Sequence, residues 1–353
     1  MIKWLSLLWL VLAGPALAVA DFAVVRPGVA ITFPRDHGAH PGFRTEWWYV
    51  TGWLRTAQGQ DLGFQITCFR RRTGVDSANP SKFVPGQILF AHAAISDPAV
   101  KRLRHAQRIA RAGFGLAEAA TQDADVVIDD WRLKRRADGR FTAHVAGAGF
   151  ALDLVLTPTQ AAILQGEAGF SRKGPAVSEA SHYYSLPHLA VSGQVTRDGG
   201  AQNVTGTAWL DREWSSTLLN PRAVGWDWLG LNMDDGGALT LFRVRDVKGD
   251  TLWAGGSHRD SKGLLVRLLP GDVRFLPGRR WKSPRTGAVY PVSPQVRVRL
   301  KGRETAFSVV PLFDDQELDS RRGGGPVYWE GAVKVPGGRG YLEMTGYATP
   351  LKM

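Results

Sequence analysis

A cluster of acidic and basic residues near the middle of the chain has the clearest capacity for chemistry. The segment TGTAWLDREWSS places Asp211, Arg212 and Glu213 directly after Trp209 in a strand-like run. A carboxyl group buried among apolar side chains can keep its proton at neutral pH, whereas an ion pair with a guanidinium keeps it ionised. Asp211 is therefore a candidate proton donor if it is buried alone, and a structural residue if it pairs with Arg212.

The strand that carries this cluster resembles a second strand near the end of the chain. Val-Thr-Gly-Thr-Ala at 204–208 is matched by Met-Thr-Gly-Tyr-Ala at 344–348, but only the first copy runs on into ionisable residues. The chain has 353 residues, and single cores seldom grow beyond about 250–300 residues. We therefore expect two similar modules, 19–220 and 221–353, with the boundary near Asn220-Pro221-Arg222, where a proline interrupts the pattern.

Both modules begin with an aromatic strand. TEWWYVTGWL, from Thr45, alternates so that Trp47 and Tyr49 share one face, and VGWDWLGL, from Val224, places Trp226 and Trp228 in a similar arrangement. Turn signals separate further strand-like runs at short spacing, which favours an all-β barrel or sandwich over βαβ units. Only residues 101–122, rich in Arg, Ala and Gln, have a composition that suggests a helix.

Aromatic strands of this kind are compatible with two interiors. A small closed barrel can hold one apolar ligand in its mouth. The same aromatic side chains can instead fill a solid core, which is the commoner arrangement for aromatic residues in strands. Strand spacing alone leaves both interiors open.

Residues 1–18 have the features of a removable export signal. Lys3 precedes an apolar run from Trp4 to Leu12, and Ala16-Leu17-Ala18 has the small-x-small pattern that signal peptidase cleaves. A retained membrane anchor is less favoured because the run is shorter than the roughly 20 apolar residues that span a bilayer. We expect cleavage near Ala18 and a periplasmic or secreted mature protein.

The charge and motif content restrict the partners. The formal net charge is +12, which favours anionic membrane surfaces. Lys and Arg occur in scattered groups without a nucleic-acid-binding motif, so nucleic acid is not expected. Asp36, His37 and His40 include a His-x-x-His spacing but lack the helix that usually presents such a pair, so neither a metal nor a cofactor is expected. The Gly-x-Ser-x-Gly motif of serine hydrolases is missing from the sequence.

Three segments carry a resemblance to a known family. FPRDHGAHPGFRTEWWYVTGWL from Phe33, SHYYSLPHLAVSG from Ser181 and TGTAWLDREWSS together resemble the carotenoid 1,2-hydratase and AttH group of lipocalin-like proteins, whose members are often labelled secreted hydrolases. The likeness extends from about Phe33 to Tyr347. It implies an all-β fold with two lipocalin-like (calycin) β-barrel domains in tandem.

The resemblance also implies a site. In the hydratases, a His-x-Trp and a later Tyr-x-Asp are thought to supply the acid, and by matching spacing these positions fall on His182, Tyr184, Trp209 and Asp211. Both aromatic positions differ in type from the hydratases. Asp211 would protonate an alkene carbon, Trp209 and Tyr184 would stabilise the cation, and His182 would return the proton. The expected ligand-binding residues are Trp47, Tyr49, Trp226 and Trp228.

Three functional hypotheses follow. The first is an exported protein that binds an apolar lipid- or isoprenoid-like molecule near the domain interface and acts on it as a hydro-lyase at Asp211. The second is a non-catalytic carrier that works with an envelope ABC-type export system, as the AttH resemblance implies, and does not depend on Asp211. The third is a scaffold that uses its basic surface on anionic membranes.

Overall fold

The computed structural model describes residues 22–75, 81, 83–217 and 219–351, so the predicted export signal lies outside the described residues. The described part is all-β, as predicted, with twenty-four strands and three short 3₁₀ helices, η1 (Arg35–His37), η2 (Pro270–Asp272) and η3 (Arg321–Gly323). None of the helices in this part of the chain is long and apolar enough to cross a bilayer.

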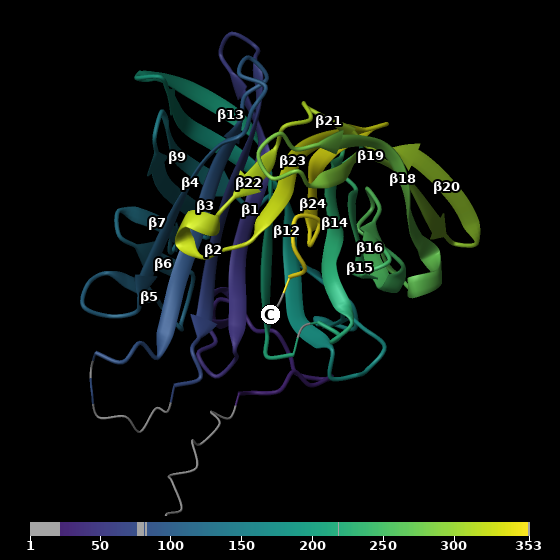
Figure 1. The fold of residues 1–353 in the computed structure, drawn as a ribbon, viewed down its shortest axis with the longest axis horizontal. Coiled ribbons are helices and arrows are strands. Elements are labelled where there is room, and N and C mark those ends of the chain that lie inside the picture. The colour runs from purple at the N-terminus through teal and green to yellow at the C-terminus, as the bar shows by residue number, and fades with distance from the viewer. Residues whose placement is uncertain (1–21, 76–80, 82, 218, 352–353) are drawn as a thin grey trace, which may run out of the picture.

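The N-terminal half forms one antiparallel sheet that curls into a nearly closed barrel (Figure 1). Its strand order is β4-β3-β2-β1-β13-β12-β9-β8-β7-β6-β5, with β10 and β11 paired to β12, and β4 at one end contacts β6 and β8 near the other. The strands are β1 (Thr45–Thr56), β2 (Asp61–Arg72), β3 (Gln87–Ser96), β4 (Arg104–Arg111), β5 (Ala117–Ala119), β6 (Asp125–Ile128), β7 (Trp131–Arg135), β8 (Phe141–Gly147), β9 (Phe150–Thr157), β10 (Ile163–Leu164), β11 (Phe170–Arg172), β12 (Ala180–Arg197) and β13 (Gly200–Ser215).

The C-terminal half contains an eight-stranded sheet and a three-stranded sheet, β18-β19-β20. The larger sheet has the order β17-β16-β15-β14-β24-β23-β21, with β22 paired to β23. The strands are β14 (Ala223–Met233), β15 (Ala238–Asp246), β16 (Thr251–Arg259), β17 (Leu265–Leu268), β18 (Val273–Lys282), β19 (Val289–Leu300), β20 (Arg303–Ser308), β21 (Val310–Pro311), β22 (Glu317–Asp319), β23 (Val327–Val335) and β24 (Gly338–Thr345). The chain passes from one half to the other between Ser215 and Ala223, and we call the halves the N-terminal and C-terminal domains.

Each domain has its own filled interior. In the N-terminal barrel, alternation along β1 turns Trp48 and Val50 inward, where they pack with Phe64, Ile66 and other buried apolar side chains. In the C-terminal domain, Leu229 and side chains of both sheets form a second core. The aromatic residues of the N-terminal barrel therefore do not enclose a ligand within it, and the solid-core alternative describes its interior.

The outward-facing residues of the same strands form the domain interface. Tyr49 and Trp53 of β1 cluster with Trp228 of β14 and Tyr341 of β24. The Trp53 indole donates a hydrogen bond to the backbone oxygen of Gly340 at 3.0 Å. Figure 1 shows β1, β12, β14 and β24 side by side at the centre of the molecule, and contacts of β1 with β24 and of β12 with β14 agree. The aromatic strands that open each domain thus face one another.

The suggestion of a helix within 101–122 is wrong. This segment forms β4 and β5, and β4 pairs with β3 from Ile88↔Arg111 to Ile95↔Arg104. Its Arg, Ala and Gln residues have a good intrinsic helix propensity, but tertiary pairing with a sheet edge outweighs that local preference.

Candidate active site

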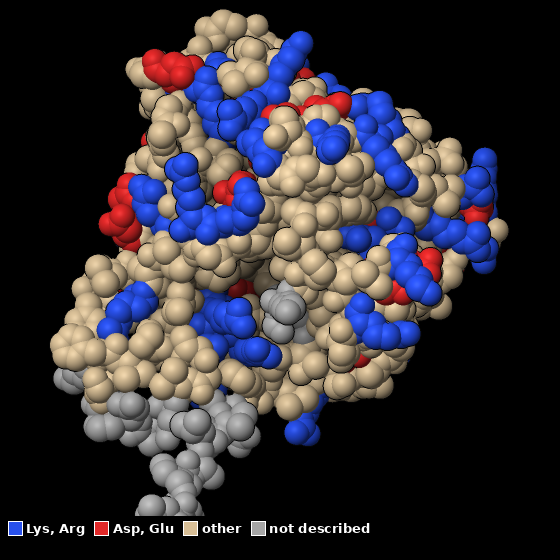
Figure 2. All heavy atoms as spheres, viewed as in Figure 1, with Lys and Arg blue, Asp and Glu red and all other residues tan. Residues whose placement is uncertain are grey.

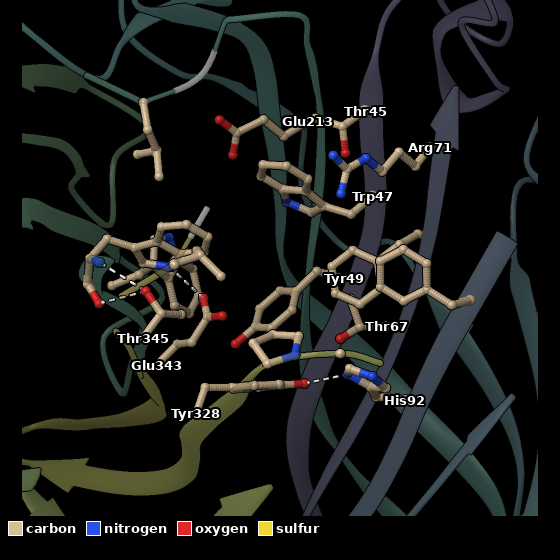
Figure 3. Close-up of a pocket in the computed structure, with 18 of the residues that line it drawn as sticks. Thr45, Trp47, Tyr49, Thr67, Arg71, His92, Glu213, Tyr328, Glu343 and Thr345 are labelled. Atoms are coloured by element: carbon tan, nitrogen blue, oxygen red, sulfur yellow. Dashed lines mark hydrogen bonds between the residues drawn. The ribbon is translucent and has the colours of Figure 1, made fainter. Parts of the chain in front are cut away.

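A cavity of about 810 Å³ lies between the two domains. It is bounded by the outer face of the N-terminal sheet and the facing side of the C-terminal sheet, so it is an interdomain cavity and not the inside of a barrel. Apolar surface predominates among its lining residues, as is usual for small-molecule sites. All four residues expected to bind the ligand line this cavity: Trp47, Tyr49, Trp226 and Trp228 (Figure 3 labels two of them).

Asp211 lies in the wall of this cavity and is buried. Its Oδ1 accepts hydrogen bonds from the Ser185 hydroxyl at 2.5 Å and the Trp209 indole at 2.7 Å, and its Oδ2 accepts one from the Tyr183 hydroxyl at 2.8 Å. Burial raises the pKa of Asp211 to about 7, while the three donors act in the opposite direction. Asp211 is therefore partly protonated at neutral pH, where an ordinary aspartate is ionised.

Arg212 does not pair with Asp211, because neighbouring residues of a strand point to opposite faces. Its guanidinium lies inside the N-terminal barrel, where it pairs with Glu46 and donates to the backbone oxygen of Gly38 at 2.5 Å. The ion pair that would have kept Asp211 ionised is thus absent from the described structure. Glu213, on the same face as Asp211, has its own cation in Lys173 at 3.1 Å.

The structure does not bring His182 and Tyr184 to Asp211. Both lie on the other face of β12, where His182 pairs in register with Trp214 and the Tyr184 hydroxyl hydrogen-bonds His37 Nδ1 at 2.6 Å. Burial lowers the pKa of His182 to about 4. The positions expected for these two residues beside Asp211 are occupied by Tyr183 and Ser185, one residue away along the same strand.

Trp209 contacts Asp211 through its indole nitrogen and meets Trp228 edge-on, with ring centroids 6.3 Å apart. It is not among the described residues that line the cavity. Its observed contact is that of a hydrogen-bond donor to the carboxyl group, whereas Tyr49 and Trp228 themselves line the cavity.

The C-terminal domain contributes two further carboxyl groups, which the sequence analysis missed. Glu330 of β23 accepts a hydrogen bond from the Tyr49 hydroxyl at 2.6 Å, and Glu343 of β24 accepts one from the Trp226 indole at 3.0 Å. Burial raises the pKa of Glu343 to about 7 and that of Glu330 well above its ordinary range, and the Glu343 charge adds to the rise at Glu330. The signal in the sequence was a lone carboxyl group within each apolar strand.

Pairing registers show that the two domains present equivalent positions to the cavity. Tyr49 of β1 lies opposite Asp211, and Trp228 of β14 lies opposite Glu343. Glu343 therefore occupies the place in the C-terminal domain that Asp211 occupies in the N-terminal domain. Only the first copy of the Thr-Gly repeat is followed by a cluster of ionisable residues, but the second domain also presents a carboxyl group at the equivalent place. The repeat missed Glu343 because it aligns the two strands in a different register from the one they adopt in their sheets.

The cavity opens at a surface with mixed charge. Arg71 is exposed and lines the cavity with Arg44. Figure 2 shows a hollow near the centre of the view, with acidic atoms inside it and basic atoms beside it, while other Lys and Arg residues are spread over this face in separate groups. The basic residues seen on this face do not merge into one continuous patch.

The Asp36, His37 and His40 group belongs to a different region, at the end of the N-terminal barrel. His40 hydrogen-bonds Asp36 and Glu46, at 3.2 Å in each case, and stacks on Trp214. Within the described ranges, no group of three or more His, Cys, Asp and Glu residues is arranged to hold a metal ion.

Comparisons with known proteins agree with this architecture. A family profile described as AttH-like matches residues 24–347. The crystal structure of an AttH protein from Nitrosomonas europaea is 52% identical, covers 92% of this chain and 99% of its own, and superposes with a TM-score of 0.86. Kievitone hydratase from Nectria haematococca is 15% identical, covers 94% and 97%, and has a TM-score of 0.67, which establishes a shared fold. No curated protein matches the sequence. With its profile match over most of its length, the chain belongs to the AttH-like family, as the sequence resemblance predicted.

Proposed function

We propose that this protein binds an apolar alkene of lipid or isoprenoid type in the interdomain cavity and adds water to it, with Asp211 as the proton donor. The observation that supports this proposal most directly is Asp211 itself, a buried carboxyl group in an aromatic cavity wall with a pKa raised to about 7. An acid of this kind is protonated where ordinary carboxyl groups are ionised. The name of the hydratase that shares the fold supports the same reaction class.

The reaction balances with one acid and one water molecule. The Asp211 O–H bond breaks as a C–H bond forms at one alkene carbon, which leaves a carbocation and the Asp211 carboxylate. A water molecule then forms a C–O bond at the other carbon and loses a proton to a base, so the net change is addition of one water molecule. The faces of Tyr49 and Trp228 would stabilise the cation, an interaction worth up to about 2 kcal/mol in a desolvated site.

The surroundings of Asp211 suit this role. Three neutral donors hold the carboxyl group in one orientation, and among the described residues no Lys, Arg or His pairs with it. Because the proton donor must be protonated, activity should fall as the pH rises through about 7.

Replacement of Asp211 tests the proposal. Squalene and geranylgeraniol, which carry trisubstituted alkenes, would be incubated with the protein in isotope-labelled water, and the labelled alcohol would be measured by mass spectrometry. We expect Asp211→Asn to lower kcat/KM by about 10²–10⁴-fold. Asp153→Asn, at an exposed acid outside the cavity, should leave turnover unchanged.

Two outcomes would contradict the proposal. Retention of full activity by Asp211→Asn would remove Asp211 from the mechanism. Binding of the alkenes without turnover by the wild-type protein, with the same affinity in Asp211→Asn, would instead make the protein a carrier, for which an ABC-type export system is the partner to test.

A further inference from the structure

We propose that Glu330 and Glu343 form a second proton-transfer site, in which the pair shares one proton and Glu343 accepts the proton of the attacking water. This inference rests on the proposed hydration at Asp211 and assigns the base that the reaction requires. It places the acid on the N-terminal domain and the base on the C-terminal domain, on the walls of one cavity.

Strand pairing holds the two glutamates together. Glu330 of β23 lies directly opposite Glu343 of β24 in the antiparallel register, and side chains at such positions have Cβ atoms about 4.5–5.5 Å apart. Both residues line the cavity. Figure 3 shows the Glu343 side chain among the residues of the cavity wall, near Thr345 and in the same view as Tyr49.

The surroundings supply no charge that would let both glutamates ionise. Asp211 and Glu213 face them from β13, Tyr49 from β1 and Tyr328 from β23, and all of these are acids. Of the basic residues that line the cavity, Lys173 pairs with Glu213, and neither Arg44 nor Arg71 forms a described ion pair with either glutamate. Two carboxyl groups that face each other without a cation titrate as a unit and hold one proton between them at neutral pH.

Hydrogen bonding determines which glutamate keeps that proton. Glu330 is almost fully buried, and its Oε1 accepts from the Tyr49 hydroxyl, whereas its buried Oε2 has no hydrogen-bond partner among the described atoms. An ionised Glu330 would leave a charged oxygen unsatisfied, so the neutral form is favoured. Glu343 is less buried and accepts from the Trp226 indole, so it ionises more readily than Glu330. Its pKa of about 7 leaves part of it ionised, and able to act as a base, at neutral pH.

This arrangement gives complementary roles to equivalent positions. Asp211 and Glu343 occupy corresponding places on β13 and β24, and the charge of Asp211 contributes to the raised pKa of Glu343 across the interface. When the carbocation forms, the water oxygen bonds to carbon and its proton moves to a Glu343 oxygen. After product release, Glu343 gives its proton to solvent water and Asp211 takes one from solvent, which restores the starting state without any other reactant.

Infrared spectroscopy tests the shared proton without any substrate. The C=O stretch of neutral carboxylic acids would be recorded between pH 5 and pH 9 for the wild type, Glu330→Gln and Glu167→Gln, an exposed control outside the cavity. We expect a neutral carboxyl band that persists at pH 9, where Asp211 and Glu343 are ionised, and that is lost in Glu330→Gln only. An unchanged band in Glu330→Gln would overturn the inference, even if hydration at Asp211 were established.

Kinetics tests the role of Glu343. With geranylgeraniol as the probe, Glu343→Gln should lower kcat by about 100-fold with little change in KM. The loss of activity toward low pH, which reports protonation of Glu343, should disappear in this variant, whereas the loss toward high pH, which reports Asp211, should remain. Glu343→Asp keeps a carboxyl group and should recover part of the activity, which a packing role would not predict.

The outcomes separate the two proposals. Full activity and an unchanged pH profile in Glu343→Gln would overturn the second site and leave Asp211 as the proposed acid. If the wild type turned over no alkene, the proposed hydration would fail, and with it the role of Glu343 as the base. The infrared measurement would then still decide whether the pair shares a proton.

Discussion

Arg212 and Asp211 lie on the two faces of β13 and are both buried, but only Arg212 is paired with an opposite charge. On the inner face, the Arg212 guanidinium pairs with Glu46, donates to backbone oxygens and lies 3.8 Å from the centroid of the Trp48 ring. On the outer face, Asp211 has three neutral donors and no described cationic partner. A buried ion pair is compensated and holds the fold, whereas a buried acid without a cation keeps its proton and can transfer it.

The C-terminal domain repeats this contrast. Asp227 of β14 is paired with Arg243 at 2.6 Å and Arg245 at 3.1 Å. On the cavity side, Glu330 and Glu343 have one neutral donor each. In both domains, therefore, the acids paired with arginine lie away from the cavity, whereas Asp211, Glu330 and Glu343 line it without a described cationic partner. Glu213, which pairs with Lys173, is the compensated acid on the cavity side.

Removal of Arg212, the buried cation that pairs with Glu46, should have the largest effect on stability. Arg212→Met leaves Glu46 buried with Arg70 as its remaining arginine partner. We expect the free energy of unfolding, measured by urea denaturation, to fall by about 3–5 kcal/mol. Arg132→Met removes an exposed pair with Asp125 and should cost less than about 1 kcal/mol. Equal losses in the two variants would mean that the Arg212 network is not compensated as described.

Asp211, which has no described cationic partner, should instead make the free energy of unfolding depend on pH. The pKa of Asp211 is raised from 3.8 in the unfolded chain to about 7, so its contribution is complete below pH 3.8 and is lost as the pH rises through 7. Between pH 5 and pH 8 the wild type should lose roughly 2–3 kcal/mol relative to Asp211→Asn. The difference would be measured by urea denaturation at each pH. Parallel pH profiles for the two proteins would show that Asp211 is ionised in the folded state.

Loss of the single hydrogen-bond donor at the Glu330 carboxyl group should have the smallest effect on stability. Tyr49→Phe removes the hydroxyl that bonds Glu330 and should cost about 1 kcal/mol in thermal or urea unfolding. Because this hydrogen bond lowers the pKa of Glu330, its loss should raise that pKa further. A double-mutant cycle with Glu330→Met isolates the pair. Additive losses in the cycle would show that the two side chains do not interact across the interface.

Strand patterns located much of the site but not the face on which each residue lies. Trp47, Tyr49, Trp226 and Trp228 were expected to bind the ligand, and they line the cavity because alternation places them on the outward face of the opening strands. His182 and Tyr184 were assigned to a motif by their spacing, and they lie on the face of β12 that is turned away from Asp211. A shift of one residue moves a side chain to the opposite face, so a spacing match without the pairing register cannot place it.

The sequence by itself determined the all-β class, the AttH-like family and the aromatic strands that face the cavity, because these depend on local alternation and on motifs within a few residues. Only the tertiary structure decided that the hollow lies between the domains, that Arg212 turns away from Asp211, and that Glu330 and Glu343 join it. Strands far apart in sequence meet through register and packing, and the burial that raises the pKa of a carboxyl group exists only once they have met.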